Sequence, residues 1–342
     1  MKVKKVRVIF NDDGPAMFRQ GGKTIEFGDL RDGAEDVAAA LREDGYETRV
    51  TGLTEDGLDG FVSEVTSGSD DIVFNLCEGA FGRSSFEMNV AAMLELYGIR
   101  FTGSGPLTLG VALNKAWTKD ILKGAGIPTA GYAVVGEVPV ELPENLRFPL
   151  IVKPLAEDAS LGIETDSVVE NVAEVSSRVA VILDKYRQSA LVEEYVDGRE
   201  FNVSVMGNGE ETRGLAPSEI DFSDYPAGLP RICSYEAKWI ETSPLYLKSP
   251  PVCPADVPRA LERRLQAIAV AAYRALMCRD YARVDMRLGA DGKLKVLEVN
   301  PNPDISRNAG FAMAASNAGM AYARLMGEIV ESAARRYGKA GG

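Results

Sequence analysis

The sequence predicts an α/β protein whose amino-terminal part holds a parallel sheet and whose carboxy-terminal part is α+β, built on antiparallel strands. In the first hundred residues, short apolar runs alternate with helical spacing, as in parallel strands joined by crossover helices. After residue 190, Asp-Gly and Asn-Gly dipeptides follow alternating runs, which indicates antiparallel hairpins. The length of 342 residues exceeds the usual size of a single core, so we expect two or three domains.

The amino-terminal part is expected to alternate strands with helices. Apolar runs predict strands at residues 6–10, 47–51, 71–76 and 99–102, and apolar spacing predicts helices at 36–42, 58–66 and 86–96. Loops at the carboxyl ends of parallel strands commonly bind ligands. The segment "NLCEGAFGRSS" (75–85) is such a loop and is therefore a candidate for ligand binding.

The middle of the chain predicts two helices around a buried strand. A single helix is expected over residues 107–123, with Lys115 and Lys119 four apart on one face. "FPLIVKP" predicts a buried strand that ends at Lys153, and the small, polar segment that follows it predicts a mobile loop. Ser167 and Glu170 match a capping box that would open a helix reaching residue 186.

The carboxy-terminal part predicts hairpins and helices around one long loop. Residues 190–210 predict a strand, an Asp-Gly turn, an alternating strand and an Asn-Gly turn. The proline-rich segment 218–254 is expected to be irregular, and long loops of this kind are usually functional. The remaining prediction is a helix at 258–277, a hairpin at 281–300 and a helix at 311–337.

Composition excludes several classes of partner. With 38 basic and 50 acidic residues, the formal charge of -12 would repel phosphate backbones and anionic lipids, so we expect neither nucleic acid nor membrane as partner. The apolar run at the amino terminus is too short for a signal peptide, and no later run could span a bilayer. Four scattered cysteines without a C-x-x-C pair indicate reduced thiols and a cytoplasmic location.

The absence of histidine narrows the chemistry further. It excludes Ser-His-Asp and Cys-His nucleophilic sites, H-E-x-x-H zinc sites and imidazole general bases. Any catalysis would therefore use carboxylates, lysine, arginine, hydroxyl groups or a hard cation.

The segment "YARVDMRLGADGKLKVLEVNPNPDIS" (281–306) concentrates polar side chains on one face of a predicted hairpin. A two-residue turn at Asp291-Gly292 would set Asp285 opposite Glu298 and Arg283 opposite Asn300. Facing carboxylates destabilise a sheet unless solvent, a shared proton or a cation neutralises them. A solvated face stays open as one interpretation, and Mg²⁺ bound together with a phosphate-bearing co-substrate is the other.

Further polar residues support a nucleotide site. Lys153 ends a buried strand just before a loop that could close over a phosphate. Glu193, at the end of the strand in "LVEEYV", could accept a hydrogen bond from an adenine amino group, and Glu200 from ribose hydroxyls. Each signal is weak by itself, but the ordered set favours a bound nucleotide.

The sequence resembles the ATP-grasp superfamily and, within it, D-alanine:D-alanine ligases. The similarity covers nearly the whole chain in order, through "YGIRFTGSGPLTLGVALNKAWTKDILKGAGIPT", "FPLIVKP", "ASLGI", "LVEEYVDGREFNVSVM", "SYEAKW", "YARVDMRLGADGKLKVLEVNPNP" and "AGMAYARLMGEIVESAAR". It implies an ATP-grasp fold with an amino-terminal domain (1–113), a central lid domain (114–191) and a carboxy-terminal catalytic domain (192–342). It also implies a homodimer.

The resemblance implies a role for each matching residue. Arg283 and Lys238 would be catalytic, with Lys238 in a second active-site loop, and Asp285, Glu298 and Asn300 would bind two Mg²⁺ ions, for which Mn²⁺ could substitute. The residues implied for ATP are Lys115, Lys153, Ala159, Ser160, Leu161, Gly162, Glu193, Glu194, Tyr195, Val196, Glu200 and Leu297. In the implied reaction a small-molecule carboxylate attacks the γ-phosphate of ATP to form an acylphosphate, and an amine then displaces phosphate to form an amide.

The departures from the family pattern fall on the substrate side. Ala159 precedes Ser160 where the family has two serines, Trp239 replaces a tyrosine, and Asp304 replaces a glycine. Ala309-Gly310 stands in place of a Ser-Leu pair, and "NLCEG" in place of a His-Gly segment. We therefore expect substrates other than the D-alanine pair, with Glu78, Arg83, Trp239 and Asp304 as candidate contacts.

Three alternatives remain at the level of sequence. The first is a divergent D-alanine:D-alanine ligase, which the acceptor-side changes disfavour. The second is a nucleotide-binding regulator without catalysis, which the intact set of Arg283, Asp285, Glu298 and Asn300 disfavours. The third is a kinase that stops at a phosphorylated product.

Overall fold

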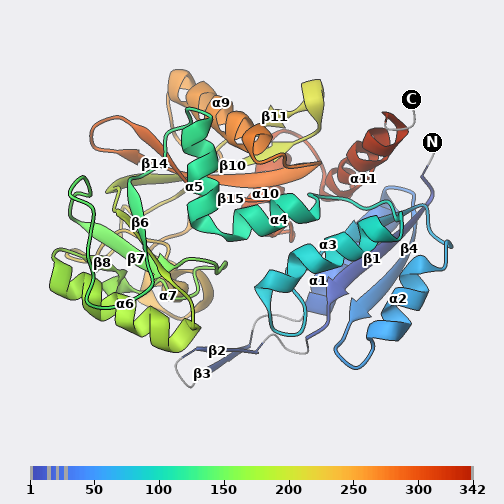
Figure 1. Ribbon diagram of the computed structural model, residues 1–342. Helices are drawn as coiled ribbons and strands as arrows, with labels where there is room; N and C mark the ends of the chain where they lie inside the picture. Colours follow the sequence, from blue (N-terminus) through green and yellow to red (C-terminus); the bar gives the residue numbers. More distant parts are fainter. Residues whose placement is uncertain (1–2, 14–16, 21–22, 27–29, 340–342) are drawn as a thin grey trace.

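The computed structural model describes residues 3–13, 17–20, 23–26 and 30–339. Its first sheet is parallel, in the strand order β4–β1–β5, as predicted (Figure 1). The elements of this part are β1 (Lys5–Asn11), β2 (Met17–Gln20), β3 (Lys23–Glu26), α1 (Leu30–Glu43), β4 (Glu47–Leu53), α2 (Leu58–Thr66), β5 (Ile72–Asn75), a 3₁₀ helix (Ser84–Phe86) and α3 (Glu87–Leu96). The strand predicted at 99–102 is reduced to one parallel bridge, between Val73 and Phe101.

The long helix predicted at 107–123 is two helices, α4 (Pro106–Leu113) and α5 (Lys115–Gly124). Asn114 separates them because its backbone is extended and its side chain accepts hydrogen bonds from the first amides of α5. Lys115 and Lys119 both lie on α5, as expected, and both are buried. The break therefore brings Lys115 into the first turn of its helix.

The second sheet is antiparallel and carries one helix on its face. Its strands β6 (Tyr132–Val135), β7 (Leu150–Pro154), β8 (Val168–Val169) and β9 (Ala190–Glu194) are ordered β6–β9–β7–β8. Helix α6 (Val172–Tyr186) packs apolar side chains against this sheet. The predicted capping box was wrong: Asn171 caps α6, and Ser167 belongs to a preceding 3₁₀ helix (Thr165–Ser167).

The Asp-Gly dipeptide after β9 does not form the predicted hairpin. Strand β9 pairs with β6 and β7, whereas β10 (Gly198–Met206) pairs with β11, β12 and β14 in another sheet. The segment therefore links two sheets. The predicted domain division stays a prediction, but a boundary at residue 191 would cut β9, so we place it after residue 194.

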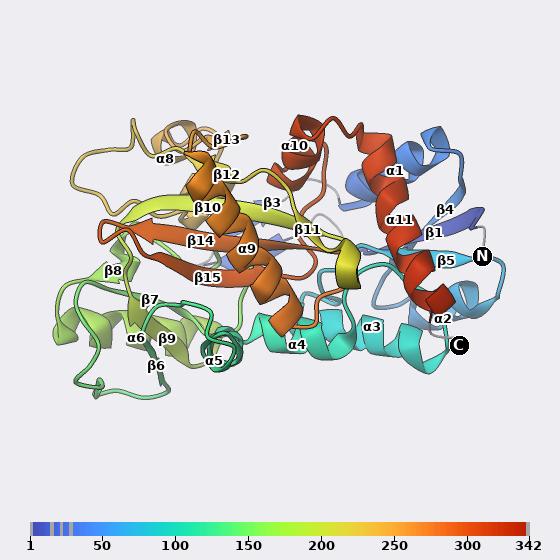
Figure 2. The same ribbon diagram turned by 90° about the horizontal axis from the view of Figure 1, so that it is seen from above.

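The third sheet has six strands under one long helix. These are β10, β11 (Arg213–Gly214), β12 (Ser218–Ile220), β13 (Pro251–Val252), β14 (Tyr281–Gly289) and β15 (Leu294–Asn300). Helix α9 (Arg259–Ala275) crosses this sheet, as Figure 2 shows. It buries Leu265, Ala269 and Ala272 against the sheet. The stretch 218–254 is less irregular than predicted, since it also contains α7 (Tyr235–Trp239) and α8 (Pro244–Leu247).

The helix predicted at 311–337 is divided into α10 (Gly310–Asn317) and α11 (Tyr322–Lys339). Gly319 lies between them with a φ of +78°, a conformation that ends a helix. Apolar residues of α11 pack with those of β1 and α1, so the end of the chain completes the core of the first sheet. None of the helices among the described residues has the length and apolar composition of a membrane span.

The β14–β15 hairpin has the predicted pairing where the charges lie. Asp285 is opposite Glu298 and Arg283 is opposite Asn300. The predicted two-residue turn was wrong, because the amide of Gly289 donates to the carbonyl of Lys293 and the strands leave the turn one residue out of the expected register. A β-bulge that leaves Leu297 unpaired between Val296 and Glu298 restores the register before the acidic pair.

Candidate active site

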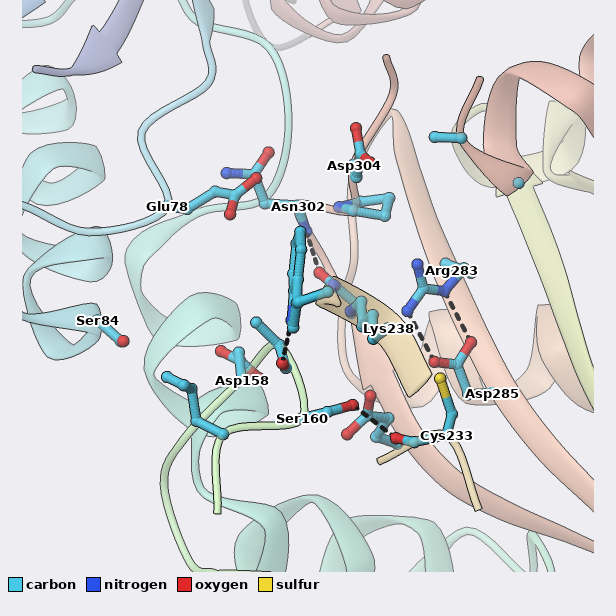
Figure 3. Close-up of a pocket in the computed structure, with 18 of the residues that line it drawn as sticks. Glu78, Ser84, Asp158, Ser160, Cys233, Lys238, Arg283, Asp285, Asn302 and Asp304 are labelled. Carbon is cyan, nitrogen blue, oxygen red and sulfur yellow. Dashed lines mark hydrogen bonds and ion pairs between the residues drawn. The ribbon is translucent and has the colours of Figure 1, made fainter. Parts of the chain in front are cut away.

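A cleft of about 1600 Å³ is lined by residues of all three large sheets and their loops (Figure 3). It collects nearly every site residue predicted from the sequence. Those lining it are Glu78, Arg83, Lys153, Ala159, Ser160, Leu161, Glu193, Glu194, Tyr195, Val196, Glu200, Lys238, Trp239, Arg283, Asp285, Leu297, Glu298, Asn300 and Asp304. Lys115 lines a small adjoining cavity of about 30 Å³ instead, together with Lys153 and Glu298.

Gly162 is the one predicted residue that lines neither cavity. Its φ is +76°, and a Cβ there would lie 2.5 Å from Cγ of Pro154. Its role is therefore to let the loop turn close to β7.

The acidic pair is held by neighbouring cations. Asp285 forms two hydrogen bonds with the guanidinium of Arg283, each 2.8 Å long, and accepts another from Asn202 (2.7 Å). Burial opposes ionisation of Arg283, but the neighbouring carboxylate of Asp285 raises the pKa of the Arg283 guanidinium above its ordinary value. Burial would raise the pKa of the Glu298 carboxyl group, but the nearby lysines, Lys115 first, outweigh this effect and lower it. Glu298 is therefore ionised at neutral pH.

The acidic pair and Asn300 suit Mg²⁺. Asp285, Glu298 and Asn300 all line the cleft, and they offer two carboxylates and one amide oxygen. Mg²⁺ usually binds proteins through one or two carboxylates and completes its shell with phosphate oxygens and water. No cluster of three or more Asp, Glu, Cys or His side chains suited to a metal occurs among the described residues.

Glu193 lies between two buried lysines. Its Oε1 is 2.6 Å from Nζ of Lys153, and its Oε2 is 2.5 Å from Nζ of Lys119. Burial alone would raise the pKa of Glu193, but the two ammonium groups lower it to about 2. The sequence identified Lys119 as a neighbour of Lys115 on one helix face but gave it no role in the site.

Glu200 is also paired, in this case with Arg287. The guanidinium of Arg287 donates to Oε2 of Glu200 at 2.6 and 3.0 Å and to the carbonyl of Val196 at 2.9 Å. Alternation along the strand predicts Arg287 on the same face as Arg283 and Asp285, but no role in the site was predicted for it.

The segment 155–164 closes over the cleft from the second sheet. Ala159 and Ser160 have φ angles of 56° and 60°, a left-handed conformation that is uncommon outside glycine. The indole N–H of Trp239 donates to the carbonyl of Ala159 (2.8 Å). Oγ of Ser160 donates to the carbonyl of Cys233 (2.9 Å), as Figure 3 shows. These two hydrogen bonds hold the loop against residues 233–239, the segment that contains Lys238.

Asp158 occupies the same loop and faces the lysines. Its carboxylate lies 3.8 Å from Nζ of Lys115, which also donates to the carbonyl of Glu157. Burial raises the pKa of Asp158, and Lys115 opposes this shift. The sequence analysis did not single out this acid, since a lone loop carboxylate carries no signal of its contacts.

At the far end of the cleft, away from the buried lysines, lie two acids that form no ion pair with any described residue. Glu78 and Asp304 come from loops after β5 and β15 and lie on the same side of the pocket in Figure 3. Desolvation within the cleft, followed by the charge of Asp304, raises the pKa of Glu78 to about 7. Arg83 packs its guanidinium over the ring of Phe86 at 4.2 Å. This end can therefore accept hydrogen bonds from a cationic group.

Comparison with known proteins identifies the family. The family described as D-ala D-ala ligase C-terminus matches residues 121–331. The D-alanine–D-alanine ligase of Bordetella petrii is 32% identical over 276 residues, covering 80% of this chain and 79% of that protein. The chain belongs to the D-alanine–D-alanine ligase family. A Sinorhizobium fredii protein named y4sG, described as uncharacterized, is 39% identical over 266 residues, covering 78% of this chain and 75% of that protein.

The fold of the D-alanine–D-alanine ligase family also appears among solved structures. A D-alanine–D-alanine ligase from Bacillus anthracis, crystallised with ATP, superposes with a TM-score of 0.74 at 22% identity, covering 98% of this chain and 99% of that one. The predicted ATP-grasp fold is thereby confirmed, and so is the prediction of a ligase that forms carbon–nitrogen bonds. The comparisons agree with a D-alanine:D-alanine ligase-like enzyme and give no support to a regulator without catalysis.

Proposed function

We propose that the protein is an ATP-dependent carboxylate–amine ligase that forms an amide through an acylphosphate. The observation that carries this proposal is the pairing of Asp285 with Glu298 at a cleft edge where Lys115, Lys153 and Arg283 converge. Two carboxylates among three cations suit a phosphate chain that arrives with a divalent ion. The relatives that are ligases support the same reaction class.

Each predicted residue has a proposed task in this reaction. Lys115 and Lys153 would hold phosphate oxygens under the loop that contains residues 159–162, while Glu193, Glu200 and the segment 194–196 would hold adenosine, with Leu297 beside it. Asp285, Glu298 and Asn300 would bind Mg²⁺, which neutralises phosphate charge when bound; the resemblance supports two ions, with Mn²⁺ as a substitute. Arg283 and Lys238 would face the charge that develops during transfer.

The reaction balances without an imidazole. A carboxylate oxygen of the first substrate attacks the γ-phosphorus of ATP, and the bond between that phosphorus and the β–γ bridging oxygen breaks to release ADP. The amine of the second substrate then attacks the acyl carbon, the carbon–oxygen bond breaks, and phosphate leaves as the amine loses a proton. In this reaction Arg283 and the lysines would position the groups and neutralise charge.

We further propose that the substrates are not both D-alanine. The support lies at the far end of the cleft, where Asp304 and Glu78 present carboxylates and Ala309-Gly310 offers no side chain able to hold a substrate carboxylate. Glu78, Arg83, Trp239 and Asp304 remain the proposed substrate contacts. The alternative, a divergent D-alanine:D-alanine ligase, is supported by the relatives of that name.

The test is Mg²⁺-dependent phosphate release from ATP across pooled D- and L-amino acids and other small acids and amines, with mass detection of the product. An amide product with release of ADP supports the ligase, and a phosphorylated acid that accumulates with or without amine would indicate a kinase instead. D-alanyl-D-alanine as the fastest product would overturn the proposed substrate difference. No nucleotide turnover with any pool would overturn the reaction itself.

Two broader expectations accompany this proposal. A cytoplasmic location is supported by the four cysteines, which are free thiols. A homodimer is supported by the family resemblance, and gel filtration with light scattering would test it.

A further inference from the structure

Lys119, Glu193 and Lys153 form one buried cluster of charges, in which Lys119 alone has no proposed contact with ATP. Lys153 and Glu193 both line the cleft, so each can contact a bound molecule. Lys119 is fully buried, with a relative exposure of 0%, and its Nζ also donates to Oγ1 of Thr129 at 2.9 Å. Thr129 in turn donates to the carbonyl of Val296 on β15, so Nζ of Lys119 is held by Glu193 on one side and by an anchored Thr129 on the other.

The two oxygens of Glu193 are used differently. Oε2 is paired with the fixed, buried Lys119, and Oε1 is paired with Lys153, which also lines the small adjoining cavity together with Glu298. If Lys153 moves to a phosphate oxygen, Oε1 becomes available to accept an N–H group. Without Lys119, the same movement would leave Glu193 as an unpaired charge at 2% exposure, which is strongly unfavourable.

We propose that Lys119 is a positioning residue for nucleotide binding. As the permanent counter-ion of Glu193, it allows the ammonium of Lys153 to leave Oε1 of Glu193 for a phosphate oxygen. Oε1 of Glu193 then accepts a hydrogen bond from the exocyclic amine of adenine. This inference rests on the proposed use of ATP. It assigns Lys119 an effect on base selectivity although the side chain itself touches no ligand.

The decisive measurement is the ratio of the dissociation constants for ATP and ITP, because ITP carries an oxygen in place of the exocyclic amine. The wild-type protein is expected to bind ATP at least about tenfold more tightly than ITP, since a hydrogen bond to a charged acceptor is lost with ITP. Lys119→Met should reduce this preference by roughly tenfold and raise the KM for ATP more than it lowers kcat. A purely structural role would lower the melting temperature without changing the ratio.

Lys123→Met is the matched control. Lys123 lies one turn further along α5 and stacks over the ring of Tyr132 at 4.0 Å, so its loss removes the same charge from the same helix without touching Glu193. Its ATP-to-ITP ratio should equal that of the wild type. Thr129→Val provides a milder test if Lys119→Met does not fold, because it frees Lys119 from one partner and should reduce the ratio by about two- to threefold.

The outcomes separate this inference from the proposed function. A folded Lys119→Met variant, or failing that Thr129→Val, with the wild-type ratio would overturn the inference alone. Equal binding of ATP and ITP by a wild-type protein that still turns over ATP would do the same. A wild-type protein that binds neither nucleotide would overturn the use of ATP and, with it, this role of Lys119.

Discussion

The two ends of the cleft are built in opposite ways. At the end proposed for the nucleotide, charges come from strands and helices and are paired: Glu193 with two lysines, Glu200 with Arg287, and Asp285 with Arg283. At the end proposed for the substrates, Glu78 and Asp304 come from loops, and within the described part of the chain neither belongs to an ion pair.

This difference indicates which part of the chemistry is fixed and which part varies. Buried pairs hold their geometry because breaking one would leave an uncompensated charge in the interior. Loop side chains without ion pairs can be replaced at little cost to the fold. The family resemblance implies the same division, because the residues that match the family pattern lie at the paired end and departures such as Asp304 and Ala309-Gly310 lie at the other.

Glu298→Gln should break the paired end with the largest effect. The amide removes one of two carboxylates proposed for Mg²⁺ and a charge that balances Lys115 and Lys153. We expect kcat to fall by more than about 10³-fold with every substrate pair, while the circular dichroism spectrum stays unchanged. Turnover within tenfold of the wild type would remove the basis for the proposed metal site.

The charges that this experiment tests were predictable because sheet geometry is periodic. Alternation along a strand placed Arg283 and Asp285 on one face, and that prediction holds. The facing of Asp285 and Glu298 was also predicted, but from a two-residue turn that the structure does not contain. Two deviations, at the turn and at the bulge beside Leu297, cancel each other, and no sequence rule specifies the bulge.

Contacts between distant segments were not predictable. The pairing of Lys119 with Glu193 depends on how α5 packs against the second sheet, and the fastening of Ala159 by Trp239 joins residues 80 positions apart. Helix breaks were missed for a different reason. Apolar spacing continues across Asn114 and Gly319, and this spacing predicts one continuous helix in each case. The helices end there because Asn114 caps α5 and Gly319 adopts a positive φ, two local effects that apolar spacing does not report.

Asp304→Asn should affect the unpaired end and leave the other intact. If Asp304 contacts the amine substrate, its loss should raise the KM for that substrate by about tenfold, with the KM for ATP unchanged. Steady-state kinetics with each substrate varied in turn would show this. A matching rise in the KM for ATP would mean that the two ends are not independent.

Trp239→Phe should act between the two ends with a smaller effect. Phenylalanine keeps most of the ring but removes the N–H group that donates to Ala159, so the loop over the cleft is held less firmly. We expect a two- to fivefold rise in the KM for ATP and faster amide hydrogen exchange in segment 155–164, from the loss of one neutral hydrogen bond. Unchanged exchange would show that the other contacts of the loop, among them those of Ser160 and Lys115, hold it without Trp239.

The smallest effect should come from Glu78→Gln, and it appears as a dependence of stability on pH. Desolvation and the neighbouring Asp304 raise the pKa of Glu78 from 4.5 in the unfolded chain to about 7 in the folded protein. Between these values the folded state binds more protons than the unfolded state, so this group's contribution to stability is fully present below pH 4.5 and is lost as the pH rises through 7.

Replacing Glu78 by glutamine should therefore leave the melting temperature unchanged near pH 4.5 and raise it near pH 8. Because water in the cleft screens the side chain, the gain should be only roughly 1–3 °C. Asp304→Asn should reduce this gain, since it removes the charge that helps to raise the pKa of Glu78. An equal gain at both pH values would show that the carboxyl group does not titrate in this range, and that a cationic substrate would meet a charged Glu78 throughout.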